Sequence, residues 1–308
     1  MTDAAREPAY APPQLRPAAT FFGAPVADIE SLGPDSIAAV GVYCDHFSAG
    51  RPGGRFGARQ LRYISAISDL SVPQTLVDLG DFNVFPLEPE RTVDTLSDQS
   101  QRIAATGAKL FAIGGDYSVT PAIVRGAAQE VGSGSLAVVR ISRRLDSLPK
   151  GTNRSGDPWR CGATNEIAEI LSGGLSAIAL LGGHGTVATE ELEQASEAVV
   201  VPASRLISAP GESAHKVRKE LEDVADRFYL SVDADVLAPR FGSRALPGTH
   251  GGLSVAHLLT VLAELVGMPF IGAELTGHVP DLDVPGRAIT SQIASVAAKV
   301  LDCLAGKT

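Results

Sequence analysis

The chain has 308 residues, and its 26 Lys and Arg residues against 35 Asp and Glu residues give a formal net charge of −9. An acidic chain without a dense basic stripe lacks the charge distribution of a nucleic-acid-binding protein, so no nucleic-acid partner is expected. Hydrophobic residues make up 44% of the chain, which is ordinary for a protein that buries a large core. The longest uncharged apolar runs, such as residues 175–181, are far shorter than the ~20 residues of a membrane span, so no membrane partner is expected.

The N-terminal segment, residues 1–19, is rich in Pro and Ala and lacks periodicity. It is predicted to be an extended or disordered arm ahead of a single domain over residues 20–308. A basic stretch followed by an apolar one is missing there, which argues against a secretory signal. The three cysteines, Cys44, Cys161 and Cys303, are odd in number and widely spaced, as reduced thiols are. These features predict a cytoplasmic protein.

Short β-branched apolar runs alternate with helix-length amphipathic stretches from residue 37 onward. Strands are predicted at residues 37–43, 75–79, 109–113, 136–141, 177–181, 227–232 and 270–273. Helices are predicted at residues 57–67, 93–105, 120–130, 165–171, 213–224, 255–265 and 290–304. This alternation predicts an α/β fold, with a mostly parallel sheet that helices cover on both faces. In such a sheet, functional groups gather at the carboxyl ends of the strands.

Two carboxylates, Asp233 and Asp235, follow an apolar strand with one residue between them. Because side chains on a strand alternate in direction, both carboxylates are expected on the same side, where they would attract a cation. The alternative is that one carboxylate caps the next turn and the other is solvated. Residues 248–254 form a glycine-bearing stretch before a predicted helix, which is typical of an active-site loop.

The segment after the strand at residues 136–141 carries charge of both signs. Ser142, Arg144 and Asp146 share one side if the chain stays extended. The adjacent Arg143 and Arg144 would need acidic partners at the end of a buried strand, which predicts a carboxylate–guanidinium cluster with Asp146 and the Asp-x-Asp pair. The alternative is a surface turn, from which both arginines reach into water.

Several motifs lie in a characteristic order along the chain: a Gly-Arg-Pro-Gly-Gly-Arg-Phe-Gly stretch at residues 50–57, a Gly-Gly-Asp turn at 114–116, Ser-x-Asp-x-Asp at 231–235, and the glycine-bearing loop after it. Together they resemble the ureohydrolase (arginase) superfamily, and its agmatinase-like branch in particular, over essentially the whole chain from about residue 19. Glu274 lies where that family has an acid after its last strands. The resemblance implies a three-layer α/β/α arginase-like fold with about eight strands. It also implies a homo-oligomer, a trimer or a hexamer.

Members of this family hydrolyse a guanidino or related C–N bond with water bridged between two manganese ions, which six protein groups hold. The resemblance implies that three of the six are replaced here: a His by Tyr117, a bridging Asp by Ser142, and a second His by Arg144. The groups that remain are Asp146, Asp233 and Asp235. Ser155 stands in the stretch that corresponds to a substrate-contacting Ser-His-Gly, whose histidine is replaced. The sequence therefore indicates a degraded metal site.

Three carboxylates hold one divalent ion at most, and weakly when a guanidinium opposes it, so a dinuclear centre is not expected. Arg144, assisted by Arg143 or Arg140, is expected to take the place of the metals and to pair with the Asp-x-Asp carboxylates. No cofactor is therefore predicted. The alternative is a single weakly held divalent metal at Asp146, Asp233 and Asp235.

The candidate catalytic residues are Asp146, Asp233, Asp235, Glu274, His250 and Arg144, and the candidate substrate-binding residues are His46, Tyr117, Ser142 and Ser155. His250 and His46 are chosen because the corresponding loops of the family border the substrate channel, and imidazole exchanges protons near neutrality. Each histidine is alternatively a packed or solvated loop residue. Glu274 is alternatively the partner of a buried arginine.

These residues predict a ureohydrolase-like enzyme that performs metal-independent chemistry on a small molecule, such as a step of specialised biosynthesis. Two alternatives stay open. One is an agmatinase- or arginase-type amidinohydrolase with an altered or mononuclear metal site. The other is a non-catalytic relative that binds a ligand or stabilises a partner complex.

Overall fold

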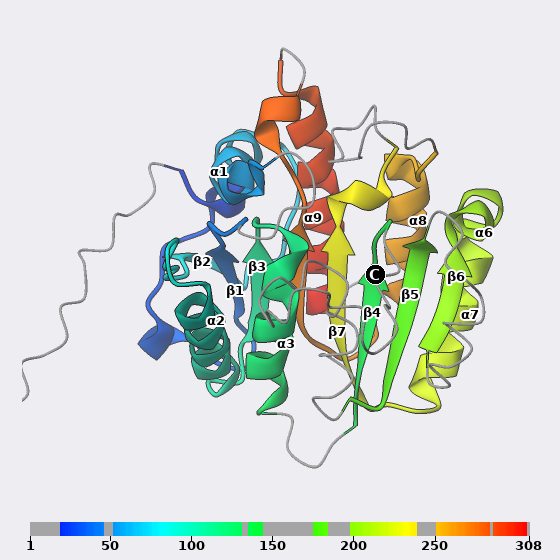
Figure 1. Cartoon of the computed structure of the whole chain (residues 1–308), viewed down its shortest axis with the longest axis horizontal. Helices are drawn as coiled ribbons and strands as arrows, with labels where there is room; N and C mark the ends of the chain where they lie inside the picture. Colours follow the sequence, from blue (N-terminus) through cyan, green and yellow to red (C-terminus); the bar gives the residue numbers. More distant parts are fainter. Residues whose placement is uncertain are drawn as a thin grey trace, which may run out of the picture.

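The computed structural model describes residues 19–45, 52–130, 135–143, 175–183, 198–238, 251–283 and 286–306. Within these ranges the chain forms one parallel sheet of eight strands in the order β2-β1-β3-β8-β7-β4-β5-β6 (Figure 1). The strands are β1 (Ile37–Gly41), β2 (Leu76–Asp81), β3 (Lys109–Ile113), β4 (Leu136–Ile141), β5 (Ala177–Gly183), β6 (Ala198–Pro202), β7 (Arg227–Asp233) and β8 (Phe270–Thr276). The arginase-like α/β fold that the sequence predicts is confirmed.

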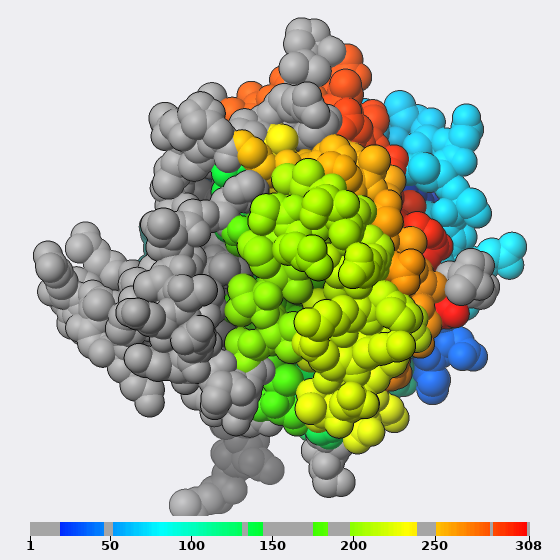
Figure 2. All heavy atoms as spheres, turned by 90° about the vertical axis from the view of Figure 1, so that its right-hand side faces the viewer, coloured from blue at the N-terminus to red at the C-terminus, as the bar shows by residue number. Residues whose placement is uncertain are grey.

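Helices cover both faces of the sheet, as a parallel sheet requires. On one face α2 (Pro89–Ala104) packs against α3 (Thr120–Ala128). On the other face the helices that neighbour one another in turn are α1 (Gly57–Ala66), α9 (Ala288–Ala305), α8 (Val255–Leu265), α7 (Pro210–Glu222) and α6 (Ala203–Ser208). Figure 2, a view from the β6 edge of the sheet, shows α6, α7 and α8 next to one another. The result is a three-layer α/β/α sandwich.

The central strands are hydrophobic on both sides because both of their faces lie under helices. All six residues of β4 and all seven of β5 are buried. Alternate side chains enter two separate cores, one under α2 and α3 and one under the other five helices. The second core includes Phe228 and Phe270, whose rings meet edge to face with centroids 6.2 Å apart.

The last helix, α9, is the core helix of the domain. Among the described residues it is the one helix long and apolar enough, by length and composition, to cross a membrane, but most of it is buried against α1, α8 and β8. Asp283 caps its first turn by accepting hydrogen bonds from the backbone N–H groups of Ile289 and Thr290. Gly306 ends it in the left-handed conformation, with φ of 65°.

The sequence pattern misses two elements near one edge of the sheet, β6 and α6. β6 is an edge strand of five residues that are only partly buried and end at Pro202, so it lacks the buried pattern of the central strands. α6 follows it at once and has only six residues, too few to display helical periodicity. The helix predicted at residues 165–171 and nearly all of the predicted arm lie outside the described residues.

Candidate active site

The turns that follow β1, β3 and β8 are bonded backbone to backbone at the carboxyl edge of the sheet. The amide of Gly115 donates to the carbonyl of Gly54 at 3.1 Å, and the amide of Gly277 donates to the carbonyl of Gly115 at 3.0 Å. A Cβ on Gly54 would lie 2.8 Å from that Gly115 oxygen. Glycine therefore lets these turns approach closely, and they form one rigid wall of the site.

Asp116 and Tyr117 form the turn after β3, and both side chains are fully buried. The Asp116 carboxylate accepts hydrogen bonds from the backbone N–H and the hydroxyl of Ser118, so it caps the short 3₁₀ helix Tyr117–Val119. Tyr117, a predicted substrate-binding residue, is one of the largest fully buried side chains of the described chain. Its neutral phenol stands where the resemblance places a histidine ligand.

The two carboxylates after β7 are buried and differ in their contacts. Asp233 accepts a hydrogen bond from the backbone N–H of Asp235 through Oδ1, at 3.0 Å. Its other oxygen, Oδ2, has no hydrogen-bond partner among the described residues. Gly277 lies beside it, with φ of +76°, and a Cβ there would come within 1.9 Å of Asp233 Oδ1. The Asp233 carboxylate thus occupies the space that any side chain at position 277 would need.

Ser142 and Arg143 connect the end of β4 to the turn after β7. Asp235 Oδ1 accepts hydrogen bonds from the Ser142 hydroxyl at 3.4 Å and from the backbone N–H of Arg143 at 3.1 Å. The Arg143 guanidinium donates to the carbonyl of Asp235 at 3.1 Å and to the carbonyl of Gly251 at 2.9 Å. Arg143 is 7% exposed, so the alternative of a solvated surface turn is wrong for this residue. Through these two hydrogen bonds Arg143 connects residue 251 to the turn after β7.

Beneath Asp233 a row of buried polar side chains crosses three strands on the α2 and α3 face. Arg140 pairs in register with Ser231, and Ser231 pairs with Glu274. Nη1 of Arg140 donates to Ser231 Oγ at 2.9 Å, and Ser231 Oγ donates to Glu274 Oε1 at 2.6 Å. The hydroxyl of Thr120, the first residue of α3, donates to the same Glu274 oxygen. We call Arg140, Ser231, Glu274 and Thr120 the cross-strand row.

Burial raises the pKa of Glu274, and Asp233 nearby raises it further. The hydrogen bonds from Ser231 and Thr120 and the charge of Arg140 act in the opposite direction. Glu274, a predicted catalytic residue, contacts the buried Arg140 through the Ser231 hydroxyl. This contact is close to the alternative stated for Glu274, the partner of a buried arginine. Ser231 and Thr120 were missed at the sequence level, although Ser231 lies two residues before Asp233 and so points to the same side.

Half of the candidate site residues lie outside the described residues: His46, Arg144, Asp146, Ser155 and His250. The structure brings Tyr117, Ser142, Asp233, Asp235 and Glu274 to the carboxyl edge of the sheet or one residue pair below it. The predicted replacement of the metals by Arg144 stays a prediction. Within the described residues, Arg140 and Arg143 are the arginines that contact this group of side chains.

Two of the described ligand positions, Tyr117 and Ser142, fit a dinuclear manganese centre poorly. In this part of the chain no group of three His, Cys, Asp or Glu side chains is placed to hold a metal ion. Tyr117 and Ser142 supply a phenol and an alcohol at two of the positions where the resemblance has an imidazole and a bridging carboxylate. Two Mn²⁺ ions need several anionic ligands, which neutral hydroxyl groups do not replace.

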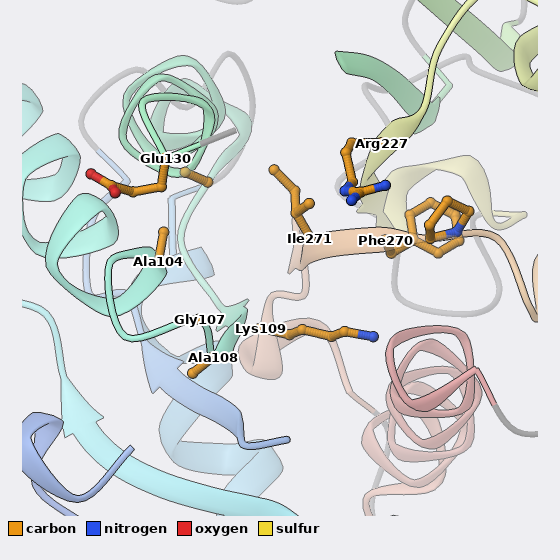
Figure 3. A pocket seen from close by; sticks show the side chains of 10 residues that line it. Ala104, Gly107, Ala108, Lys109, Glu130, Arg227, Phe270 and Ile271 are labelled. Atoms are coloured by element: carbon orange, nitrogen blue, oxygen red, sulfur yellow. The ribbon is translucent and has the colours of Figure 1, made fainter. Parts of the chain in front are cut away.

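A pocket of about 370 Å³ lies at the opposite, amino end of the sheet, among the starts of β3, β7 and β8. Figure 3 shows Glu130 on one side of it and Arg227 and Ile271 on the other. Lys109 lies at its base, and its ammonium group donates to the carbonyl of Leu304 in α9 at 2.5 Å. Because of its place at the amino end, this pocket is separate from the residues described above.

The Arginase family model matches residues 35–306 of the chain. The proclavaminate amidinohydrolase of Streptomyces clavuligerus is 28% identical over 280 residues, which cover 86% of this chain and 87% of the relative. The mitochondrial guanidino acid hydrolase of Homo sapiens is 24% identical over 311 residues, which cover 92% of this chain and 84% of the relative. The structure of the S. clavuligerus enzyme superimposes with a TM-score of 0.76 at 25% identity, covering 96% of this chain and 100% of that one.

Proposed function

Since the chain belongs to the arginase family, we propose that it is an enzyme that keeps the family's site at the carboxyl edge of the sheet and acts on a small molecule without a dinuclear manganese centre. The observation that carries the proposal is the pair of neutral groups, Tyr117 and Ser142, at ligand positions of the family. Tyr117 is fully buried and Ser142 is 1% exposed. Both side chains are therefore part of the packed interior of the site.

The groups that we propose for the chemistry are the acids of the site. Asp233 offers one carboxylate oxygen that no described residue uses, and it is held in place through its other oxygen. A fixed carboxylate with a free oxygen can accept a proton from a bound molecule or hold a cationic group of it. Glu274 lies directly below, and its raised pKa favours a carboxyl group that can carry a proton.

The second candidate is an agmatinase- or arginase-type amidinohydrolase with one divalent metal. Oδ2 of Asp233 favours it, because this buried carboxylate oxygen has no hydrogen-bond partner among the described residues and an oxygen of this kind suits a cation. The name of the S. clavuligerus relative, an amidinohydrolase, points the same way. In that case a metal bound by Asp146, Asp233 and Asp235 would supply an activated water.

We further propose that the protein is a cytoplasmic homo-oligomer, a trimer or a hexamer, whose partners are small molecules. A step of specialised biosynthesis is the setting that we propose. Light scattering coupled to size-exclusion chromatography measures the oligomeric state. A monomer at micromolar concentration would contradict this part of the proposal.

Metal content decides between the two candidates. The purified protein is stripped with EDTA and dialysed to equilibrium against Mn²⁺, and the metal bound per chain is measured by plasma mass spectrometry as the excess over the dialysis buffer, so that a weakly held ion is also counted. We expect less than about a tenth of a metal ion per chain, because Tyr117 and Ser142 replace two of the ligands that would hold it. One ion or more per chain, with release of urea from agmatine or arginine, would establish the second candidate.

A reversion variant is the matched positive control. Tyr117→His, Ser142→Asp and Arg144→His together restore the ligand types that the resemblance requires. If the scaffold has kept its geometry, this triple variant takes up Mn²⁺ under conditions in which the unmodified chain does not. Equal metal content in both proteins would mean that neutral Tyr117 and Ser142 are not what prevents metal binding.

A further inference from the structure

Three carboxylates and two guanidinium groups are buried on β4, β7, β8 and the turns directly after them in the described chain, namely Asp233, Asp235, Glu274, Arg140 and Arg143. Buried charges of one sign repel one another strongly unless a charge of the opposite sign lies nearby. Arg143 donates to two backbone carbonyls and so also holds a loop. Arg140 lies deeper, at 1% exposure, and reaches a carboxylate through a hydroxyl group.

The cross-strand row connects Arg140 to Glu274 through the Ser231 hydroxyl. Its three members on the sheet occupy paired positions on neighbouring strands, so their side chains lie side by side on one face. The Ser231 hydroxyl accepts from Arg140 and donates to Glu274, which polarises it toward the carboxylate. Glu274 Oε1 receives two hydroxyl hydrogen bonds, and its Oε2 has no partner among the described residues.

We propose that Arg140 is an internal cation of this site: a positioning residue that, through Ser231, balances the charge of Glu274 and Asp233 from below. A cation beneath the carboxylates takes over the charge balance that an ion above them would provide. Glu274 and Asp233 each keep one oxygen that is not bound within the described chain. Arg140 therefore lets these two acids stay close together while both of those oxygens remain available. This inference deepens the proposed function, but it concerns coupling between side chains and can be measured without knowing the substrate.

The test is a double-mutant cycle, measured by urea unfolding in EDTA at neutral pH with Arg140→Ala, Glu274→Gln and the double variant. We expect Arg140→Ala to lower the folding equilibrium constant about a hundredfold or more, because it leaves buried carboxylates without their cation. Adding Glu274→Gln is expected to recover most of that loss. If Arg140→Ala lowers the free energy of unfolding by the same amount with and without the Glu274→Gln substitution, the proposal is overturned.

A matched control uses a second buried arginine. Arg62 is 2% exposed and pairs with Asp78 through two hydrogen bonds of 2.9 Å. Glu274→Gln is expected to give no recovery in an Arg62→Ala background. Recovery there as well would show that Glu274→Gln stabilises the chain generally, which would overturn the specific coupling.

Chemical rescue separates a charge role from simple packing. Millimolar methylguanidinium is expected to raise the unfolding midpoint of Arg140→Ala, whereas methylurea, with the same shape and no charge, is not. The double variant is expected to respond equally to both compounds. Equal rescue of the single variant by both compounds would assign Arg140 a packing role and overturn the proposal.

If the Arg140→Ala variant does not fold alone, the fraction of folded protein is compared instead. We expect this fraction to rise when Glu274→Gln is added, or when methylguanidinium is present. Failure of both to restore folding would overturn the proposal. Because the whole cycle is run in EDTA, its outcome is independent of metal content. Metal uptake by the unmodified chain would refute the proposed function and leave the Arg140 coupling standing.

Discussion

His278 makes the stability of this protein sensitive to acid. The side chain is 3% exposed, and its Nε2 lies 3.1 Å from the hydroxyl oxygen of Thr290. That hydroxyl already donates to Asp283 Oδ2 at 2.6 Å, so Nε2 must carry the hydrogen and donate to Thr290. Nδ1 is then the lone-pair nitrogen, and it has no partner among the described residues. A proton added to Nδ1 would be buried without an acceptor in this part of the chain.

Burial lowers the pKa of His278 from 6.5 to about 4, although Asp283 opposes the change; Arg287 lowers it further. In the unfolded chain the imidazole titrates near its ordinary pKa of about 6.5. As the pH falls from about 6.5 to about 4, the unfolded state therefore binds a proton that the folded state does not. The stabilisation by neutral His278 is complete above about pH 6.5 and is lost toward pH 4. At about 1.4 kcal/mol for each pH unit, the loss amounts to about 3 kcal/mol.

The assay is urea unfolding at a series of pH values for the unmodified chain and for His278→Gln. Glutamine places its amide near the position of Nε2 and does not titrate, so the variant is expected to lack this component of about 3 kcal/mol. His215→Gln is the control, because His215 on α7 has a side chain that is 54% exposed. It is expected to follow the unmodified chain. If His278→Gln loses as much stability between pH 7 and pH 4 as the unmodified chain, the burial argument is wrong.

Three further outcomes follow from the packing. Gly277→Ala is expected to destabilise the fold by about 3 kcal/mol or more, seen as a lower thermal midpoint, because its Cβ would overlap Asp233 Oδ1 and its φ is +76°. Gly126→Ala places a Cβ 2.1 Å from the Ser97 carbonyl oxygen and separates α2 from α3, so its urea midpoint is expected to drop by the equivalent of about 2 kcal/mol. Burial raises the pKa of Cys303 to about 12, so mass spectrometry is expected to find this thiol alkylated at mildly alkaline pH only after unfolding. Early alkylation of Cys303, or unchanged midpoints for the two glycine variants, would contradict these expectations.

The fold could be predicted from the sequence because its central strands are buried on both faces. The pattern gives the bounds of β3, β4 and α8 as the structure has them. A continuous apolar run bounded by turn residues is specific when the strand lies in the middle of a parallel sheet. The same reasoning misses β6, because an edge strand is only partly buried and resembles any short apolar segment.

The site could be predicted in its placement and only partly in its contacts. The pattern puts Asp233 and Asp235 at the carboxyl edge, and both are buried there. Asp235, however, lies in the 3₁₀ helix Ala234–Val236, so strand alternation does not decide its side, and Asp233 caps this turn, as the alternative has it for one of the two acids. The pattern does not say which groups they bind, because partners come from other strands whose order the sequence does not display. Arg143 illustrates this: its guanidinium donates to the backbone carbonyls of Asp235 and Gly251, two contacts that the sequence does not indicate.

The carboxyl end of the sheet has two polar layers, and they have different roles in charge balance. Asp233 and Thr276 are paired in the upper layer, and Ser142 follows Ile141, the partner of Val232, so it lies level with them. The cross-strand row lies two residues earlier on each strand, on the same side. Metal ions bound to the upper layer would supply positive charge from above it. Here the lower layer contains a fully buried arginine while the upper layer has neutral Ser142 at a ligand position. Arg140, two positions before Ser142, thus explains how the buried acids of the upper layer are balanced in charge. The residues at the ligand positions do not explain this by themselves.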